Sequence, residues 1–231
     1  MSTKAATYEA EVLSRTPLAA HLVRLVLGGP GLAGFTSTAI PDEWVGLVVP
    51  GQFQSRYYTV RSWDGDRLTL DVVVHDVGLV TEWAAGDCVG DLVTVTEPKG
   101  SFDMPPGAAW LMLVGDLTAL PAIARIAAEA APGTRMRAII EVHDAQEEQS
   151  LATKGDLEVE WVHRSAAFAG SPTLAERAIE AIGPSSADTY IWVACEKADV
   201  RAVRKFMKSQ QTGWKHKYVA WYWERGVAEP V

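Results

Sequence analysis

Cysteine is scarce in this sequence, and several short motifs of common enzymes are missing. Only two of the 231 residues are cysteines, which excludes a disulfide-stapled secreted scaffold and favours a reducing compartment. There is no CxxC, HExxH or GxSxG motif, and the five histidines are scattered. A thiol redox site, a zinc protease and a serine hydrolase therefore find no support. We expect neither a bound metal ion nor a catalytic acid–base pair or nucleophile.

Long hydrophobic runs and an excess of positive charge are also missing. No apolar stretch approaches the ~20 residues that span a bilayer, and residues 1–11 lack the features of a signal peptide. The 21 basic and 29 acidic residues give a net charge of −8, which disfavours binding to phosphate backbones. We expect a soluble, cytoplasmic protein that has no nucleic-acid partner and does not insert into a membrane.

The composition is that of a folded protein, and the residue pattern changes at Pro105-Pro106-Gly107. Before this point, short stretches enriched in β-branched residues alternate with Gly, Pro and Asp-Gly turns, which is typical of antiparallel strands. Six such strands, with one short helix over 79–85, predict a barrel or sandwich for residues 1–105. The strands are expected over 8–14, 21–27, 44–49, 55–61, 67–75 and 91–96.

After the double proline, strands and helices alternate. The apolar run 110–114 is continuous, as in a strand that is covered on both faces. Alternation of this kind predicts a doubly wound α/β domain, with a parallel sheet and right-handed crossovers, for residues 106–231. Strands are expected over 110–114, 136–142, 157–162, 190–194 and 218–223, and helices over 118–130, 172–182 and 199–210.

Three patterns suggest a function but have a simpler explanation. Residues 29–34 satisfy GxGxxG, yet the residues after them form a poor helix, so we assign this motif to a turn. The acids and the histidine of 141–148 suggest a metal site, but they lack regular ligand spacing, and an acidic surface loop is favoured. The stretch 201–217 has six basic residues and no acid. A solvated helix face is favoured there over a site for a phosphate or an anionic chelate.

The strand around Arg56 carries a combination suited to a flavin nucleotide. Strand alternation places Arg56 and Tyr58 on one face, and Tyr57, Thr59 and Arg61 on the other. An arginine beside an aromatic ring offers a clamp for a pyrophosphate next to a flat surface for stacking. A neighbouring hydroxyl can bond to a ring nitrogen. The alternative is a purely structural aromatic strand.

Two loops could complete a nucleotide site. His75 ends a strand, and Gly78 precedes a helix whose first amides could hold a phosphate. Gly115 directly follows a buried strand and precedes a helix, with Asp116 or Thr118 as its cap. Ligands of parallel sheets collect at such carboxyl ends, where glycine lets them approach the backbone. A connecting helix and an ordinary strand-to-helix turn are the alternatives.

These motifs occur in one order along nearly the whole chain, and together they resemble the siderophore-interacting protein family. This family comprises FAD-binding ferric-siderophore reductases, related to vibriobactin-utilisation proteins and more distantly to ferredoxin–NADP reductases. The resemblance implies a six-stranded antiparallel FAD-binding barrel followed by a doubly wound NAD(P)H-binding domain. It also implies electron flow from NAD(P)H through FAD to a ferric siderophore, with release of Fe(II). The segments that carry it are 22–35, 56–61, 75–84, 100–102, 115–123, 140–144 and 222–226.

The resemblance further implies roles for single residues. Arg56 would clamp the FAD pyrophosphate, Tyr58 would pack on the isoalloxazine, and Thr59 would bond near its N5. The C-terminal strand would lie close to the crevice between the domains, where the nicotinamide enters. The other implied cofactor contacts are Val60, His75, Gly78 and Thr81 at the flavin, and Gly115, Asp116 and Thr118 at the nicotinamide.

The sequence departs from the family's pattern at three places, and two other functions stay open. Leu79-Val80 stands where the family commonly has Pro-Ala, Leu117 replaces an acid, and Gly46 replaces a frequent lysine. One alternative is a general NAD(P)H–flavin oxidoreductase with another electron acceptor. The other is a module that binds flavin or siderophore without turnover. The choice between NADH, NADPH and a ferredoxin-like electron donor stays open as well.

Overall fold

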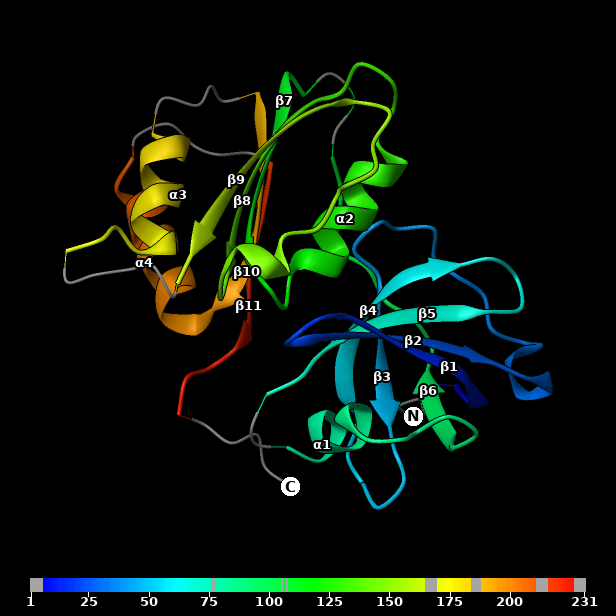
Figure 1. Ribbon diagram of the computed structural model, residues 1–231. Coiled ribbons are helices and arrows are strands. Elements are labelled where there is room, and N and C mark those ends of the chain that lie inside the picture. The colour runs from blue at the N-terminus through cyan, green and yellow to red at the C-terminus, as the bar shows by residue number, and fades with distance from the viewer. Residues whose placement is uncertain are drawn as a thin grey trace, which may run out of the picture. The chain divides into compact units, whose positions relative to one another are not determined.

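The computed structural model describes residues 6–75, 78–104, 106, 108–164, 170–183, 188–210 and 216–226 (Figure 1). Contacts between residues divide the chain into two compact units, the first ending at Ser101 and the second beginning at Phe102. In the described part of the chain, no helix is long and apolar enough to cross a bilayer.

The first unit is a closed antiparallel barrel with the strand order β1-β2-β5-β4-β3-β6. Closure leaves no unpaired sheet edge, and side chains alternate between the interior and the outer surface. The barrel confirms the prediction for this half of the chain and decides against an open sandwich. Its strands are β1 (Thr7–Ala19), β2 (Leu22–Gly28), β3 (Trp44–Val48), β4 (Arg56–Trp63), β5 (Leu68–Val73) and β6 (Leu92–Thr96).

One helix and one turn complete the barrel. Helix α1 (Leu79–Ala85) has the predicted bounds, and its Val80 and Ala84 join the barrel core. The GxGxxG motif forms the short 3₁₀ turn η1 (Pro30–Leu32). A Cβ on Gly31 would lie 2.3 Å from the backbone oxygen of Glu9, so the glycine lets this turn lie against β1. The assignment of the motif to a turn is confirmed.

The second unit is a parallel sheet with the strand order β11-β10-β7-β8-β9. Helix α2 covers one face of the sheet, and α3 and α4 cover the other (Figure 1). This arrangement confirms the predicted doubly wound domain. Its elements are β7 (Trp110–Asp116), α2 (Leu120–Glu129), β8 (Arg135–Val142), η2 (Ala145–Glu147), β9 (Asp156–His163), α3 (Leu174–Ile182), β10 (Thr189–Glu196), α4 (Lys197–Ser209) and β11 (Lys217–Trp223).

The strand order defines where a ligand of this sheet is expected. From β7 the chain proceeds outward through β8 and β9, and then returns to the other side of β7 as β10. The sheet therefore has its topological switch point between β7 and β10, and ligands of open α/β sheets bind outside the carboxyl ends of such strands. Asp116 ends β7 and Glu196 ends β10, so these two residues flank the expected crevice.

Candidate functional site

Strand β4 carries the predicted flavin motif at its start. Arg56 and Tyr58 are half-buried, and Tyr58 packs against the barrel core. Tyr57 is 73% exposed, whereas Thr59 is only 7% exposed. Strict alternation therefore ends at Thr59 and Val60, which are both buried, and the register shifts between Val60 and the residues that follow. The pairing of β4 with β3 is regular up to Thr59, and the β-bulge after Val60 changes the direction of the side chains that follow it.

A polar group without a partner lies just before this strand. Among the residues that the structure describes, Gln52 Oε1 is buried and has no hydrogen-bond partner. The guanidinium of Arg56 lies 3.4 Å from the Ser55 carbonyl oxygen. A buried polar atom that stays unpaired costs about 1–3 kcal/mol, so this segment is suited to a ligand that supplies partners. Sequence reasoning missed Gln52, since no motif includes it.

The loop between β5 and α1 brings three predicted contacts together. The Thr81 hydroxyl donates to the His75 carbonyl oxygen at 2.5 Å, while the His75 side chain is exposed. Gly78 begins the helix with a φ of +134°, a conformation that glycine adopts without steric cost. The first amides of α1 are not used by the helix's own ladder. Residues 76 and 77 between them lie outside the described residues.

Gly115 has a packing role at the end of β7. A Cβ on this residue would lie 2.5 Å from the Cβ of Ala119 and 3.0 Å from the carbonyl oxygen of Ala194. The missing side chain therefore lets α2 approach the sheet closely, as the third glycine of dinucleotide-binding turns does. The predicted contact between Gly115 and a nucleotide stays a prediction.

Asp116 does not cap α2, and neither does Thr118, so that prediction is wrong. The helix begins one residue after Ala119, which has no side-chain cap. Asp116 Oδ1 instead accepts from the backbone amide of Thr118 at 2.9 Å and from its hydroxyl at 2.5 Å. An aspartate that bonds two residues ahead closes an Asx turn, and this turn separates the strand from the helix.

The other oxygen of Asp116 holds the C-terminal strand. Asp116 Oδ2 accepts from Trp223 Nε1 at 2.7 Å, although the two residues lie far apart in the sequence. The carboxylate is 4% exposed. Burial raises the pKa of Asp116, and the hydrogen bonds from Thr118 and Trp223 oppose this rise. Sequence reasoning placed Trp223 near the site but missed this bond.

Further charged groups line the carboxyl edge of the sheet. Arg164 pairs with Glu141 at the end of β8. Burial raises the pKa of Asp199 on α4, and the carboxylates of Glu141 and Glu196 add to this rise. For Glu196 itself, burial acts in the same direction, but the amides of Arg225 and Ala198 donate to it and lower its pKa. The carboxyl ends of the strands therefore carry several acidic side chains that interact with other groups of the protein.

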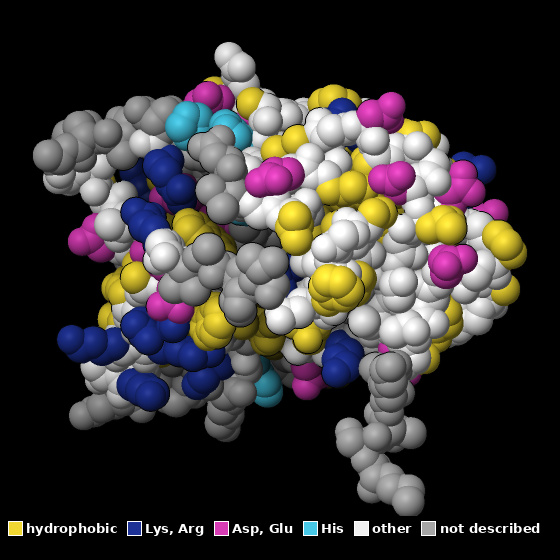
Figure 2. Space-filling model, turned by 90° about the horizontal axis from the view of Figure 1, so that it is seen from below, with side chains coloured by type: hydrophobic (Ala, Val, Ile, Leu, Met, Phe, Trp, Pro, Cys, Tyr) yellow, Lys and Arg dark blue, Asp and Glu magenta, His cyan; other side chains and the backbone are white. Residues whose placement is uncertain are grey.

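The two remaining charged segments behave largely as expected. The acids of 141–148 bond to protein groups: Glu147 accepts from the His143 amide, and Glu148 contacts His163 at 2.7 Å. Glu147 is buried, so the loop is only partly on the surface. Among the described residues, no cluster could hold a metal ion. On α4 the exposed basic side chains are Arg201, Arg204, Lys205 and Lys208, and Figure 2 shows Lys and Arg side chains gathered at the left of its view.

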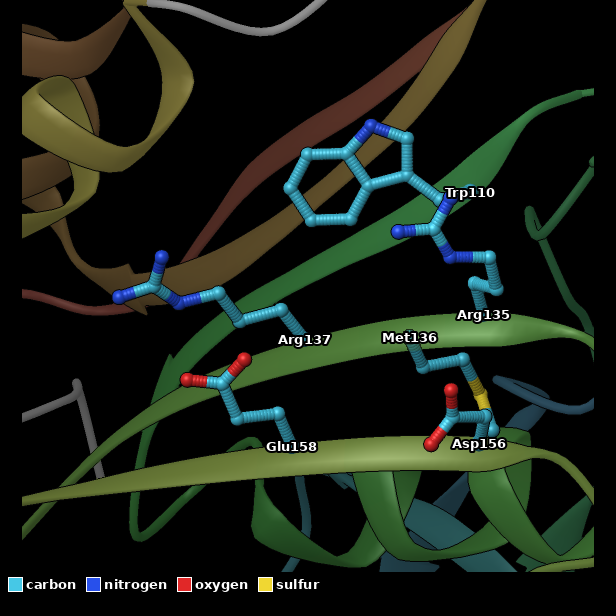
Figure 3. Close-up of a pocket in the computed structure, with 6 residues that line it drawn as sticks. All are labelled: Trp110, Arg135, Met136, Arg137, Asp156 and Glu158. Atoms are coloured by element: carbon cyan, nitrogen blue, oxygen red, sulfur yellow. The ribbon is translucent and has the colours of Figure 1, made fainter.

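A pocket of about 270 Å³ lies at the opposite edge of the sheet (Figure 3). It is formed at the amino ends of β7, β8 and β9, by Trp110, Arg135, Met136, Arg137, Asp156 and Glu158. None of the predicted cofactor contacts lines it. The pocket is therefore separate from the switch point, and no step of the function is assigned to it.

Comparison with known sequences decides the family. The model of the siderophore-interacting protein family matches residues 108–226, more than half of the chain. The model of the siderophore-interacting FAD-binding domain matches residues 51–102, which include the flavin motif of β4. The chain belongs to the siderophore-interacting protein family. The predicted resemblance is confirmed, and the chain has this family's FAD-binding domain.

Individual relatives agree with this assignment. An uncharacterized protein of Mycobacterium tuberculosis is 32% identical over 181 residues, covering 67% of this chain and 64% of the relative. This chain thus spans less than two-thirds of that protein's length. An NADPH-dependent ferric-chelate reductase of Escherichia coli is 28% identical and is covered over 92% of its length, with 93% of this chain. A siderophore utilization protein from T. fusca has a crystal structure with a TM-score of 0.79, 29% identity and coverage of 96% and 94% of the two chains.

One departure of this siderophore-interacting protein from the family's pattern has a structural reason. A Cβ on Gly46 would lie 2.9 Å from the Ser55 Cβ and 3.0 Å from the Thr96 Cγ2. The Gly46 amide donates to the Thr96 hydroxyl at 2.8 Å. Ser55 and Thr96 thus occupy the space that the stem of a lysine would need. Side chains of the barrel therefore fill this position, and it is not open to a charged ligand.

Proposed function

We propose that this protein is a flavin-dependent ferric-siderophore reductase that uses NAD(P)H as its electron donor. The observation that carries the proposal is the segment 52–59, which combines the cation of Arg56 with a buried Gln52 oxygen that has no partner in the described part of the chain. This segment falls within the match to the FAD-binding domain. A redox cofactor also explains why no acid–base pair or nucleophile stands out in the sequence.

The residues of β4 and α1 fit FAD in charge and shape. Arg56 would bind the pyrophosphate, because a guanidinium pairs with two phosphate oxygens at once. Tyr58 would present its ring to the isoalloxazine, and the Thr59 hydroxyl would bond near N5. The neighbouring Val60 would complete this wall through its backbone. His75, Gly78 and Thr81 would hold the turn at which the first amides of α1 meet a phosphate.

Bound FAD supplies the chemistry that amino-acid side chains lack, namely acceptance of a hydride and delivery of single electrons. The protein's own share is to bind, orient and exclude water. The switch point between β7 and β10 is the expected place for the nicotinamide. Gly115, Asp116 and Thr118 lie at its border. The ferric siderophore is substrate and brings its own iron ligands, so the protein needs no metal-binding residues.

Anaerobic absorbance spectroscopy tests this proposal in one cuvette. Protein loaded with FAD should lose its flavin absorbance on addition of NADH or NADPH, and should regain it when a ferric siderophore is added. A ferrous chelator such as ferrozine should report one Fe(II) for each electron transferred. Bleaching by a nucleotide without recovery on any ferric siderophore would point to a general flavin oxidoreductase. Failure of both nucleotides to bleach the flavin would favour a ferredoxin-like donor or a binding module.

A further inference from the structure

A hydrogen bond joins the carboxyl end of β11 to the end of β7, on the other side of β10. Trp223 is the last residue of β11, and its indole N–H bonds to Asp116 at the end of β7. Strand β10 lies between these two strands, and neighbouring strands are about 4.8 Å apart. The indole must therefore reach over the end of β10 to meet the carboxylate.

Two more contacts fix the same short segment, which we call the clasp (Trp223, Glu224 and Arg225). The backbone amide of Arg225 donates to Glu196 Oε1 at 3.1 Å, and the Glu224 carboxylate pairs with Lys197. These partners belong to the end of β10 and the start of α4. In the described part of the sheet, β11 pairs only with β10. The end of an edge strand is otherwise held only by its one neighbour. Here, polar contacts to β7, β10 and α4 fix it as well.

Asp116 is placed to support a neighbour rather than to touch a ligand. Its side chain is buried, and both carboxylate oxygens are used, one by Thr118 and one by Trp223. The indole of Trp223 is only half-buried. The clasp thus leaves an aromatic surface at the carboxyl edge, while the carboxylate that fixes it is withdrawn from solvent.

We propose that Asp116 is a positioning residue, which holds the Trp223 ring over the end of β10 as a preformed part of the surface that binds the nucleotide donor. The inference rests on the proposed function, because it takes the donor to bind at the switch point. A ring fixed before binding loses no freedom when the ligand arrives, which favours affinity. Loss of the bond between Asp116 and Trp223 should therefore raise the KM for the nucleotide and leave kcat nearly unchanged.

The first test is structural and needs no turnover. Trp223 contributes one indole cross-peak to a ¹H–¹⁵N spectrum of the FAD-loaded protein, identified by its loss in Trp223→Phe. In Asp116→Asn this cross-peak should shift, because the charged acceptor is gone. In the control Asp156→Asn, an exposed aspartate at the other edge of the sheet, it should stay in place. An unchanged Trp223 cross-peak in Asp116→Asn would overturn the proposal.

The second test is kinetic and uses the same variants. Asp116→Asn and Trp223→Phe should each raise the nucleotide KM by about five- to tenfold, the scale of one ordinary hydrogen bond. The double variant should be no worse than the poorer single variant, since Asp116 acts through Trp223. Asp156→Asn should match the parent protein. Multiplied effects in the double variant, a loss confined to kcat, or an unchanged KM would each contradict the proposal.

A third measurement separates this proposal from the proposed function. Each FAD-loaded variant is reduced with dithionite instead of a nucleotide, and ferric siderophore is then added. Reoxidation at the parent rate, together with a raised nucleotide KM, supports the clasp. If even the dithionite-reduced parent does not reduce a ferric siderophore, the proposed function fails. In that case, the indole cross-peak of Trp223 still tests whether Asp116 positions the Trp223 ring.

Discussion

At the scale of single residues, Arg56 and its neighbours carry the proposed flavin site. The sequence motif predicted the residue types, because a cation, an aromatic ring and a hydroxyl on one strand suit a flavin nucleotide. It did not predict that Thr59 is buried together with Val60, nor the β-bulge after Val60. A bulge depends on how β4 pairs with β5, and local alternation contains no information about that pairing.

Replacing Arg56 tests the site directly. Arg56→Ala should weaken FAD binding by about 1.5–3 kcal/mol, because a charge-assisted bond to the pyrophosphate is lost. The dissociation constant is measured by quenching of flavin fluorescence. Arg67→Ala is the matched control, since Arg67 is an exposed arginine at the start of the next strand, and it should bind FAD normally. Equal affinities in the two variants would remove Arg56 from the site.

Gly115 has a packing role that the sequence did not predict, beside its predicted contact with the nucleotide. Gly115→Ala should destabilise the α/β unit by about 1–3 kcal/mol, because the new methyl group would collide with Ala119 directly before α2. Denaturant unfolding measures this change. Gly183→Ala serves as control, since Gly183 has helical dihedral angles of −49° and −47° and should tolerate alanine. A Gly115→Ala variant as stable as the control would show that the contact between α2 and β7 can relax.

At the scale of elements, the sequence predicted every α-helix and every strand of the described chain in order. Helix α1 has the predicted bounds, because turn residues flank a short amphipathic stretch. Strand β1 is longer than predicted. Pro17 and the polar stretch before it do not resemble a strand in the sequence, although this part pairs irregularly with β2. The bond between Asp116 and Trp223 could not be predicted, because it depends on the order β11-β10-β7 rather than on any local pattern.

The turn into α1 offers a prediction at this scale. Thr81→Val keeps the shape of the side chain but removes the hydroxyl that bonds to the His75 carbonyl oxygen. We expect a loss of about 1–2 kcal/mol in barrel stability, with weaker FAD binding because the first turn of α1 is no longer fixed. Thr81→Ser retains the hydroxyl and should behave like the parent protein. If Thr81→Ser loses stability and Thr81→Val does not, the methyl group rather than the hydrogen bond holds this turn.

At the scale of the whole molecule, charge is distributed unevenly. The net charge is −8, and acids collect at the carboxyl edge of the sheet, whereas exposed bases gather on α4 (Figure 2). The acids at the edge bond to protein groups, so they organise the edge instead of forming an open anionic site. The barrel supplies the cation for a pyrophosphate, and the α/β unit supplies the switch point. The proposed function therefore assigns FAD binding to the barrel and nucleotide binding to the α/β unit.

The most direct test of the account is the titration of flavin-free protein with FAD. Isothermal calorimetry and visible absorbance should together give one FAD bound per chain, with the flavin bands shifted relative to free FAD. FMN, which lacks the pyrophosphate and the adenosine, should bind far more weakly. A protein that stays folded by circular dichroism but takes up no FAD would contradict the account.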